Sequence, residues 1–135
     1  MTLGLALPAY AASAATAAAA SSAQQANPFF ADSPLPLHFP QFDKIKDSDF
    51  APAFDAGMAQ QLKEVEAIAN TKAKPTFENT IIALEKSGDT LDRATTVFFS
   101  LVGADTNDTR KKLQADYSAK FAAHSDAIAL NGKLF

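Results

Sequence analysis

The most regular apolar pattern in the chain lies between Asp47 and Asn70. Its apolar side chains recur at steps of three and four, which places them on one face of an α-helix; they are Phe50, Phe54, Met58, Leu62, Val65 and Ala69. Asp47 or Ser48 is expected to cap this helix, and Pro52 is expected within its first turn, where a missing N–H costs little. The stretch therefore predicts an amphipathic helix of roughly 30 Å that buries one face.

A second helix is predicted after a break at residues 71–75. Thr76 opens it, and Gly88 stands where a left-handed residue commonly ends a helix. Its buried side is expected to consist of four apolar residues, namely Phe77, Ile81, Ile82 and Leu84.

Two further helices are predicted in the second half of the chain. The third starts at Asp89 or Thr90 and stops at Gly103, with an apolar side made of Leu91, Ala94, Val97, Phe98, Leu101 and Val102. The fourth is capped by Thr106 or Asn107 and runs from about Asp108 to Ala129, with a stripe of Leu113, Tyr117, Phe121, His124 and Ile128. Because no β-type alternation occurs and the connections are short, the predicted fold class is all-α: an antiparallel helical array of about four helices.

The first forty residues follow other patterns. Residues 1–26 combine a short apolar run, small-x-small triplets and an Ala/Ser-rich stretch, which predicts the end of a secretory signal followed by a flexible linker. Export to the periplasm is the expectation, and a cytoplasmic location is the alternative. Residues 27–40, here named the strap, carry four of the seven prolines. We expect an extended strap that lies on a hydrophobic surface and opens the helical region 27–135; a ligand for a proline-reading domain is the weaker alternative.

Composition narrows the possible partners. The net charge is -3, with 15 acidic and 12 basic residues, and the densest basic run, Arg110–Lys112, is interpreted as a solvated helix face. Neither nucleic acid nor a membrane surface is therefore an expected partner, and no apolar stretch reaches the roughly twenty residues of a membrane span. The absence of cysteine excludes disulfides, thiol catalysis and thiolate metal sites.

Histidine chemistry is limited to two residues. A catalytic zinc needs three protein ligands, and His38 and His124 lie far apart in the sequence. His124 is followed by Ser125 and Asp126, but adjacent helical residues point about 100° apart and do not form a catalytic triad. We therefore expect His124 to be a partly buried histidine whose hydrogen-bonding groups are satisfied.

Other candidate groups also have a structural interpretation. A pair of carboxylates for acid–base catalysis could come from Glu78, Glu85 and Asp89. The position of Glu78 is explained by the favourable field at a helix N-terminus, and Glu85 and Asp89 are explained as ordinary surface charge. Phe98 and Phe99 could line a hydrophobic binding groove, but the favoured interpretation is that both side chains pack between helices. No catalytic, cofactor-binding or metal-binding residue is predicted in this chain.

Several stretches, taken in order, resemble a known family. They are FDKIKDSDFAPAFDAGMAQQLKEVEAIAN (42–70), PTFENTIIALEKSGDTLDRATTVFFSL (75–101), ADTND (104–108) and AAHSDAIALNGKLF (122–135). Together they resemble the N-terminal helical region of the M3 zinc metallopeptidases, the thimet oligopeptidase family, and in particular its bacterial peptidyl-dipeptidase branch. The resemblance runs from about Asn27 to the last residue.

The resemblance implies a helical ellipsoid with a deep channel, one zinc held by H-E-x-x-H and a later glutamate, and release of C-terminal dipeptides from short peptides. That motif is absent here, so the zinc site is expected beyond Phe135, and the chain alone is expected to bind no zinc and to be inactive. This segment would form part of the channel wall, and the rest of the peptidase would pack on its helices. In the isolated chain, Phe50, Phe54 and Met58 are therefore expected to be partly exposed. The alternative is a stand-alone helical binding or regulatory module derived from such a peptidase.

Overall fold

The computed structural model describes residues 27–134, and within that range every regular element is a helix. The long elements are α2 (Asp47–Ala69), α4 (Asp89–Ala104) and α5 (Asp108–Ala129). The short ones are η1 (Pro28–Phe30), η2 (Pro36–His38), η3 (Phe77–Ile82) and α3 (Ala83–Glu85). The predicted signal and linker, residues 1–26, lie outside this range.

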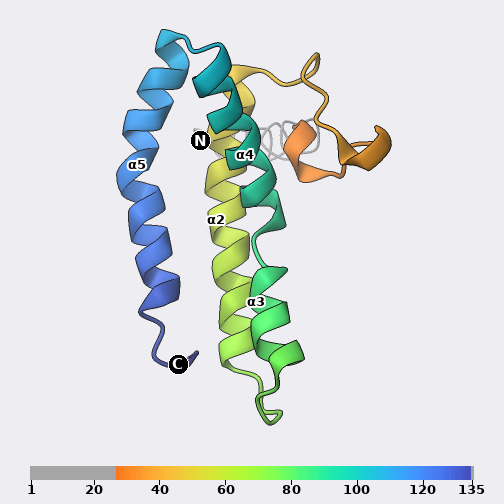
Figure 1. Cartoon of the computed structure of the whole chain (residues 1–135). Helices are drawn as coiled ribbons and strands as arrows, with labels where there is room; N and C mark the ends of the chain where they lie inside the picture. Colours follow the sequence, from red (N-terminus) through yellow and green to blue (C-terminus); the bar gives the residue numbers. More distant parts are fainter. Residues whose placement is uncertain (1–26, 135) are drawn as a thin grey trace, which may run out of the picture.

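The helices form an antiparallel array (Figure 1). Helix α2 runs in one direction, η3, α3 and α4 return beside it, and α5 follows the direction of α2 again. The predicted all-α array is therefore confirmed. It contains three long helices, because the second predicted helix is a π-helical segment, η3, followed by the short α3. Within residues 27–134, no helix has the length and apolar character that a membrane span requires.

Phe54 of α2 joins the three long helices. Its side chain is fully buried, and its ring centroid lies 5.2 Å from that of Phe98 on α4 and 5.1 Å from those of Tyr117 and Phe121 on α5. Phe50 is equally buried. The expectation that these phenylalanines remain partly exposed is wrong, because α4 and α5 of this same chain cover them.

Gly57 allows α2 and α4 to approach closely. A Cβ atom at Gly57 would lie 2.9 Å from the backbone N and Cα of Leu91, a distance that real Cβ atoms do not show. The buried face of α2 passes through Gly57 and reaches Val65, whereas Leu62, expected on that face, is exposed. Leu62 follows Gln61, which faces α5 and the α3–α4 junction, and it therefore points about 100° away from that face.

The start of α2 differs from the prediction. Its N-cap is Lys46, whose N–H donates to the Asp49 carboxylate at 2.8 Å. Asp47 instead accepts hydrogen bonds from Arg110 Nε and Asn107 Nδ2, both at 2.7 Å. The predicted cap at Asp47 or Ser48 is therefore wrong, because the Asp47 side chain ties α2 to the start of α5.

Other helix boundaries are mixed in outcome. Pro52 lies in the second turn of α2, so its predicted first-turn position is wrong. Helix α4 ends at Ala104, one residue beyond the predicted stop at Gly103. Thr76 caps η3 by accepting a hydrogen bond from the Asn79 N–H at 3.1 Å, and Gly88 has a left-handed φ of 79°. Asn107 caps α5 as one of the two predicted residues.

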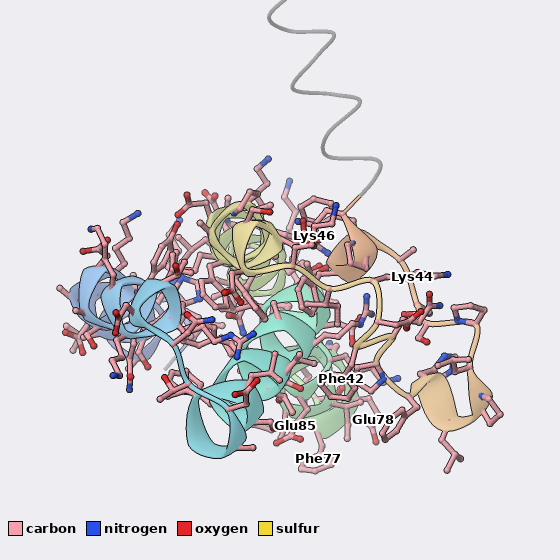
Figure 2. The ribbon with its side chains drawn as sticks, turned by 90° about the horizontal axis from the view of Figure 1, so that it is seen from above. Phe42, Lys44, Lys46, Phe77, Glu78 and Glu85 are labelled. Atoms are coloured by element: carbon pink, nitrogen blue, oxygen red, sulfur yellow. The ribbon has the colours of Figure 1, made fainter. Side chains whose placement is uncertain are left out.

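The predicted buried side of the second helix is wrong for two residues. Phe77 is 63% exposed and Ile81 is 44% exposed, whereas Leu84 is half-buried. Figure 2 shows Phe77 at the outer edge of the molecule, on the side away from α2. The π-helical pairing of η3 changes the angular spacing of side chains, so Phe77 and Ile81 do not share the face of Leu84.

The strap contacts the core at one end only. Pro28 and Pro36 each begin a 3-10 turn, so the strap is not extended throughout; proline fits the first helical position, where no N–H is needed. Phe29 is buried, with its ring 5.2 Å from that of Phe50. The later apolar residues are exposed, namely Leu35, Leu37 and Phe39.

Arg93 of α4 fastens the buried end of the strap. Its Nη1 donates to the carbonyl oxygens of Phe29 at 2.9 Å and Ala31 at 3.0 Å. Its Nη2 pairs with the carboxylates of Asp32 at 2.6 Å and of Asp89. One guanidinium thus connects the strap to α4.

Candidate functional site

A groove of about 950 Å³ opens between α5 and the α3–α4 junction and is here named the α4–α5 groove. Figure 1 shows the helices that form its two sides, α5 on one and α4 with α3 on the other. The α4 side carries Leu91, Thr95, Thr96 and Phe99, and the α5 side carries Phe121, His124, Ser125 and Ile128. Gln61 of α2 lies between them.

Hydrogen bonds from α2 hold the junction at one end of this groove. Gln61 Nε2 donates to the Ser87 carbonyl at 3.3 Å, and the Gly88 N–H donates to the Glu64 carboxylate at 2.8 Å. A Cβ atom at Gly88 would lie 2.4 Å from the Gln61 amide. The left-handed φ of Gly88 favours glycine here, and any larger residue would also displace the Gln61 amide from its hydrogen bonds.

His124 completes a hydrogen-bonded chain across the groove. Its Nε2 lies 2.7 Å from Gln61 Oε1, and because that oxygen only accepts, Nε2 carries the proton. Nδ1 is then an acceptor, and it is buried with no partner among the described residues. Burial lowers the pKa of His124 below its ordinary value, which favours the neutral ring.

The junction end of the groove is acidic. Glu85, Asp89 and Asp92 line it, with Lys86 as its one basic lining residue. Asp89 is paired with Arg93, whereas Glu85 and Asp92 form no ion pair within residues 27–134. The groove therefore combines an apolar interior with a negatively charged end.

The two histidines do not come together. His38 lies exposed on the strap, with Nδ1 3.1 Å from the Ser33 carbonyl oxygen, whereas His124 lies on α5 in the α4–α5 groove. The prediction that His124 is partly buried is confirmed, but the prediction that its ring is satisfied is only half right: Nε2 is bonded to Gln61, whereas Nδ1 has no partner among the described residues. Neither Ser125 nor Asp126 hydrogen-bonds to its ring in the described part of the chain.

A zinc site does not fit these residues. Between residues 27 and 134, no group of three histidine, aspartate or glutamate side chains is placed to hold a metal ion. The Nε2 atom of His124 is engaged by Gln61 and its Nδ1 is buried, so neither nitrogen is free to approach a metal.

The carboxylates and phenylalanines weighed as candidates take different positions. Glu78 lies exposed in the first turn of η3, and Glu85 lies exposed at the end of α3, where it lines the α4–α5 groove. Phe98 is fully buried in the core, as helix packing predicts. Phe99 is 46% exposed and lines the groove, so the packing interpretation is wrong for it.

The basic run of α5 serves local charge pairing. The Arg110 side chain is 14% exposed and is paired with Asp47. Lys111 and Lys112 are exposed and lie near carboxylates of their own helix. The interpretation as a solvated helix face is confirmed for the two lysines.

Within residues 27–134, these features define a helical packing segment with a groove and with no metal-binding cluster. No protein-family profile matches the chain. It is 49% identical over 109 residues to a dipeptidyl carboxypeptidase of Salmonella typhimurium, and 47% identical over 109 residues to that of Escherichia coli. In both cases the match covers 81% of this chain and 16% of the relative.

The resemblance to the peptidyl-dipeptidase branch predicted from the sequence is thereby confirmed, and the chain is similar to a segment of these two dipeptidyl carboxypeptidases. It spans about one sixth of the length of these relatives.

Proposed function

We propose that this chain is the N-terminal helical region of an exported, zinc-dependent oligopeptidase that releases C-terminal dipeptides from short peptides. The observation that carries the proposal is the 47–49% identity to two dipeptidyl carboxypeptidases over 109 residues. Because the match covers 16% of each relative, the zinc site and the catalytic groups belong to the rest of the longer polypeptide. This segment then forms part of the wall that limits access to the substrate channel.

The rest of the polypeptide is expected to pack on the exposed apolar residues of this segment. Phe77 and Ile81 of η3 and Phe99 of α4 are the main helical residues of this kind. Each Å² of apolar surface removed from water contributes about 25 cal/mol, so their burial would add stability to the longer protein.

The activity is tested by comparing residues 1–135 with the extended reading frame. Equilibrium dialysis against about micromolar zinc and cleavage of a quenched fluorescent peptide are the two measurements. The short chain should bind no stoichiometric zinc and cleave nothing, because its histidines do not converge, whereas the extended protein should do both. One tightly bound zinc on the short chain, or no cleavage by the extended protein, would contradict the proposal.

A second candidate is a stand-alone helical binding module derived from such a peptidase. The observation in its favour is the α4–α5 groove, which a partner could fill. The nucleotide sequence after codon 135 separates the two: an open frame that reaches an H-E-x-x-H motif supports the peptidase, and a stop codon with its own regulatory context supports the module.

Export is the localisation we propose. The pattern of residues 1–26 supports a periplasmic protein whose mature N-terminus lies between Ala12 and Ala26. N-terminal sequencing of the natively expressed protein tests this, and recovery of Met1 from the cytoplasm would refute it.

A further inference from the structure

We propose that the α4–α5 groove receives one additional helix, an amphipathic one with a basic flank, supplied by the part of the longer polypeptide outside this chain. The proposal rests on the proposed function for the source of the helix, and on the groove itself for its chemistry. It specifies one contact surface between this segment and the rest of the protein.

The shape of the groove suits a helix because both of its sides are helical ridges. On α4, Leu91, Thr95 and Phe99 follow one another at steps of four, and on α5, Phe121 and Ile128 are separated by two turns. Side chains at such spacing form ridges between which a third helix can pack. Phe99, at 46% exposed, is the large apolar residue that this packing would cover.

The charge of the groove selects the kind of helix. Three carboxylates, Glu85, Asp89 and Asp92, line the junction end against one ammonium group, Lys86. Asp89 is already paired with Arg93. The carboxylates of Glu85 and Asp92 are therefore the ones that can form new ion pairs. Lysine or arginine beside the apolar stripe of the incoming helix would meet them.

The same charge argues against a second copy of this chain as the occupant. In a twofold dimer across this groove, the second copy would bring the same lining, in which Glu85, Asp89 and Asp92 outnumber Lys86, and so would supply no basic flank. Like charges brought together in an interface cost free energy. A segment of the same polypeptide is available instead, because the relatives are about six times longer than the matched stretch.

The experiment uses the 135-residue chain and fluorescein-labelled peptides, with fluorescence anisotropy as the measurement. One peptide of about 18 residues, or roughly 27 Å as a helix, carries leucine at steps of three and four with lysine flanks. Its partner peptide is identical except that glutamate replaces lysine. The basic peptide should bind about tenfold more tightly at low salt, and the difference should shrink at about 0.5 M salt, where screening is strong.

Three variants separate the contributions to binding. Phe99→Glu should abolish binding of both peptides, because it places a charge on the apolar wall. Glu85→Gln with Asp92→Asn should remove only the preference for the basic peptide. Leu130→Glu is the matched control: Leu130 is 81% exposed and does not line the groove, so its replacement should change neither affinity.

A second set of peptides tests the source of the helix. Overlapping peptides of about 20 residues should cover the E. coli dipeptidyl carboxypeptidase outside its 109 matched residues. At least one with an apolar stripe and basic flank should bind, and Phe99→Glu should prevent it. Binding of the designed peptide without binding of any E. coli peptide would refute the proposed source.

Other results would overturn the proposal at the groove itself. The proposal would be overturned if the two designed peptides bound with equal affinity or if neither bound. It would also be overturned if binding survived Phe99→Glu. A dimer of the chain in sedimentation equilibrium that Phe99→Glu dissociates would identify a second copy as the occupant. A lack of peptidase activity in the extended protein would contradict the proposed function and leave these binding results unchanged.

Discussion

Replacing Gly57 by alanine tests the closest contact between α2 and α4. Helix propensity favours the change, because alanine in a helix interior is about 1 kcal/mol better than glycine. Packing opposes it, because the new Cβ would lie 2.9 Å from the N, Cα and Cβ atoms of Leu91. Two of these three atoms belong to the backbone, so the contact is relieved only if α4 moves as a unit.

The packing cost should outweigh the propensity gain. Overpacking a close contact costs about 1–3 kcal/mol, and a contact against backbone lies in the upper part of that range. After the propensity gain is subtracted, Gly57→Ala should lower the free energy of unfolding by about 1–2 kcal/mol. For a domain of this size, that corresponds to a decrease in Tm of about 5–10 °C. Gly57→Val should cost more than Gly57→Ala, since it adds a β-branched side chain at the same point.

The measurement is urea unfolding followed by circular dichroism, with Gly103→Ala as the control. Gly103 also lies inside a helix, but a Cβ added there meets nothing within 4 Å. Gly103→Ala should therefore leave stability unchanged or raise it by up to about 1 kcal/mol. If Gly57→Ala is as stable as the wild type, or gains stability as Gly103→Ala does, the close approach of α2 and α4 at this point is refuted.

Three further changes test the side-chain contacts. Tyr117→Phe removes a hydroxyl that donates to the Ala51 carbonyl at 3.1 Å, so it should lower the free energy of unfolding by about 1 kcal/mol; an unchanged urea midpoint would contradict this. Burial, and to a smaller extent the nearby Asp55 carboxylate, raises the pKa of Tyr117 from 10.0 to about 12. The free energy of unfolding of the wild type should therefore fall as the pH rises from 10 to about 12, and Tyr117→Phe should not show this loss. Burial lowers the pKa of His124, so the unfolded state binds a proton more readily than the folded state, and the free energy of unfolding should fall as the pH drops below about 6.5. In thermal melts, His124→Gln should make Tm depend less on pH in this range. An unchanged pH dependence of Tm would exclude His124 as its source. Arg93→Ala removes the hydrogen bonds that hold the strap to α4. In limited proteolysis, the strap of Arg93→Ala should be cleaved faster than the strap of Arg93→Lys. Equal cleavage rates in the two variants would show that the guanidinium geometry is unimportant.

Periodicity was sufficient to predict the long helices. The predicted fourth helix, from about Asp108 to Ala129, has the observed bounds of α5, and all five residues of its stripe are buried or half-buried. The first helix was predicted to within one residue at its C-terminal end. Long amphipathic segments are predictable because one burial face repeats over many turns.

Features set by contacts between distant segments were not predictable. Asp47 has the right chemistry to cap α2, but Arg110 and Asn107, which are remote in sequence, bind its carboxylate instead. Gly57 has no side chain to mark it as a core residue, and only the approach of Leu91 shows its role. In η3, six residues are too few for the helical period to fix which face is buried.

The groove also depends on three-dimensional placement. Phe98 and Phe99 are adjacent, so on a helix they point in directions about 100° apart, and both cannot face the same core. That geometry was a usable signal that Phe99 lies elsewhere. The partner of His124 was not predictable, because Gln61 is brought to it only when α2 and α5 pack together.

The distribution of burial explains how a segment of this size can hold its own core and still present surface to a larger protein. Phe50, Phe54 and Phe98 contact one another within this segment and are fully buried, so the central core does not depend on chain from outside. The exposed apolar residues lie outside that core, with Phe77 on η3 and Phe99 in the groove. A segment whose core residues contact one another can fold before its outer surfaces are covered, because burial within the segment opposes the conformational entropy cost of ordering the chain. Additional helices would then add stability at Phe77 and Phe99 without rearranging the contacts around Phe54.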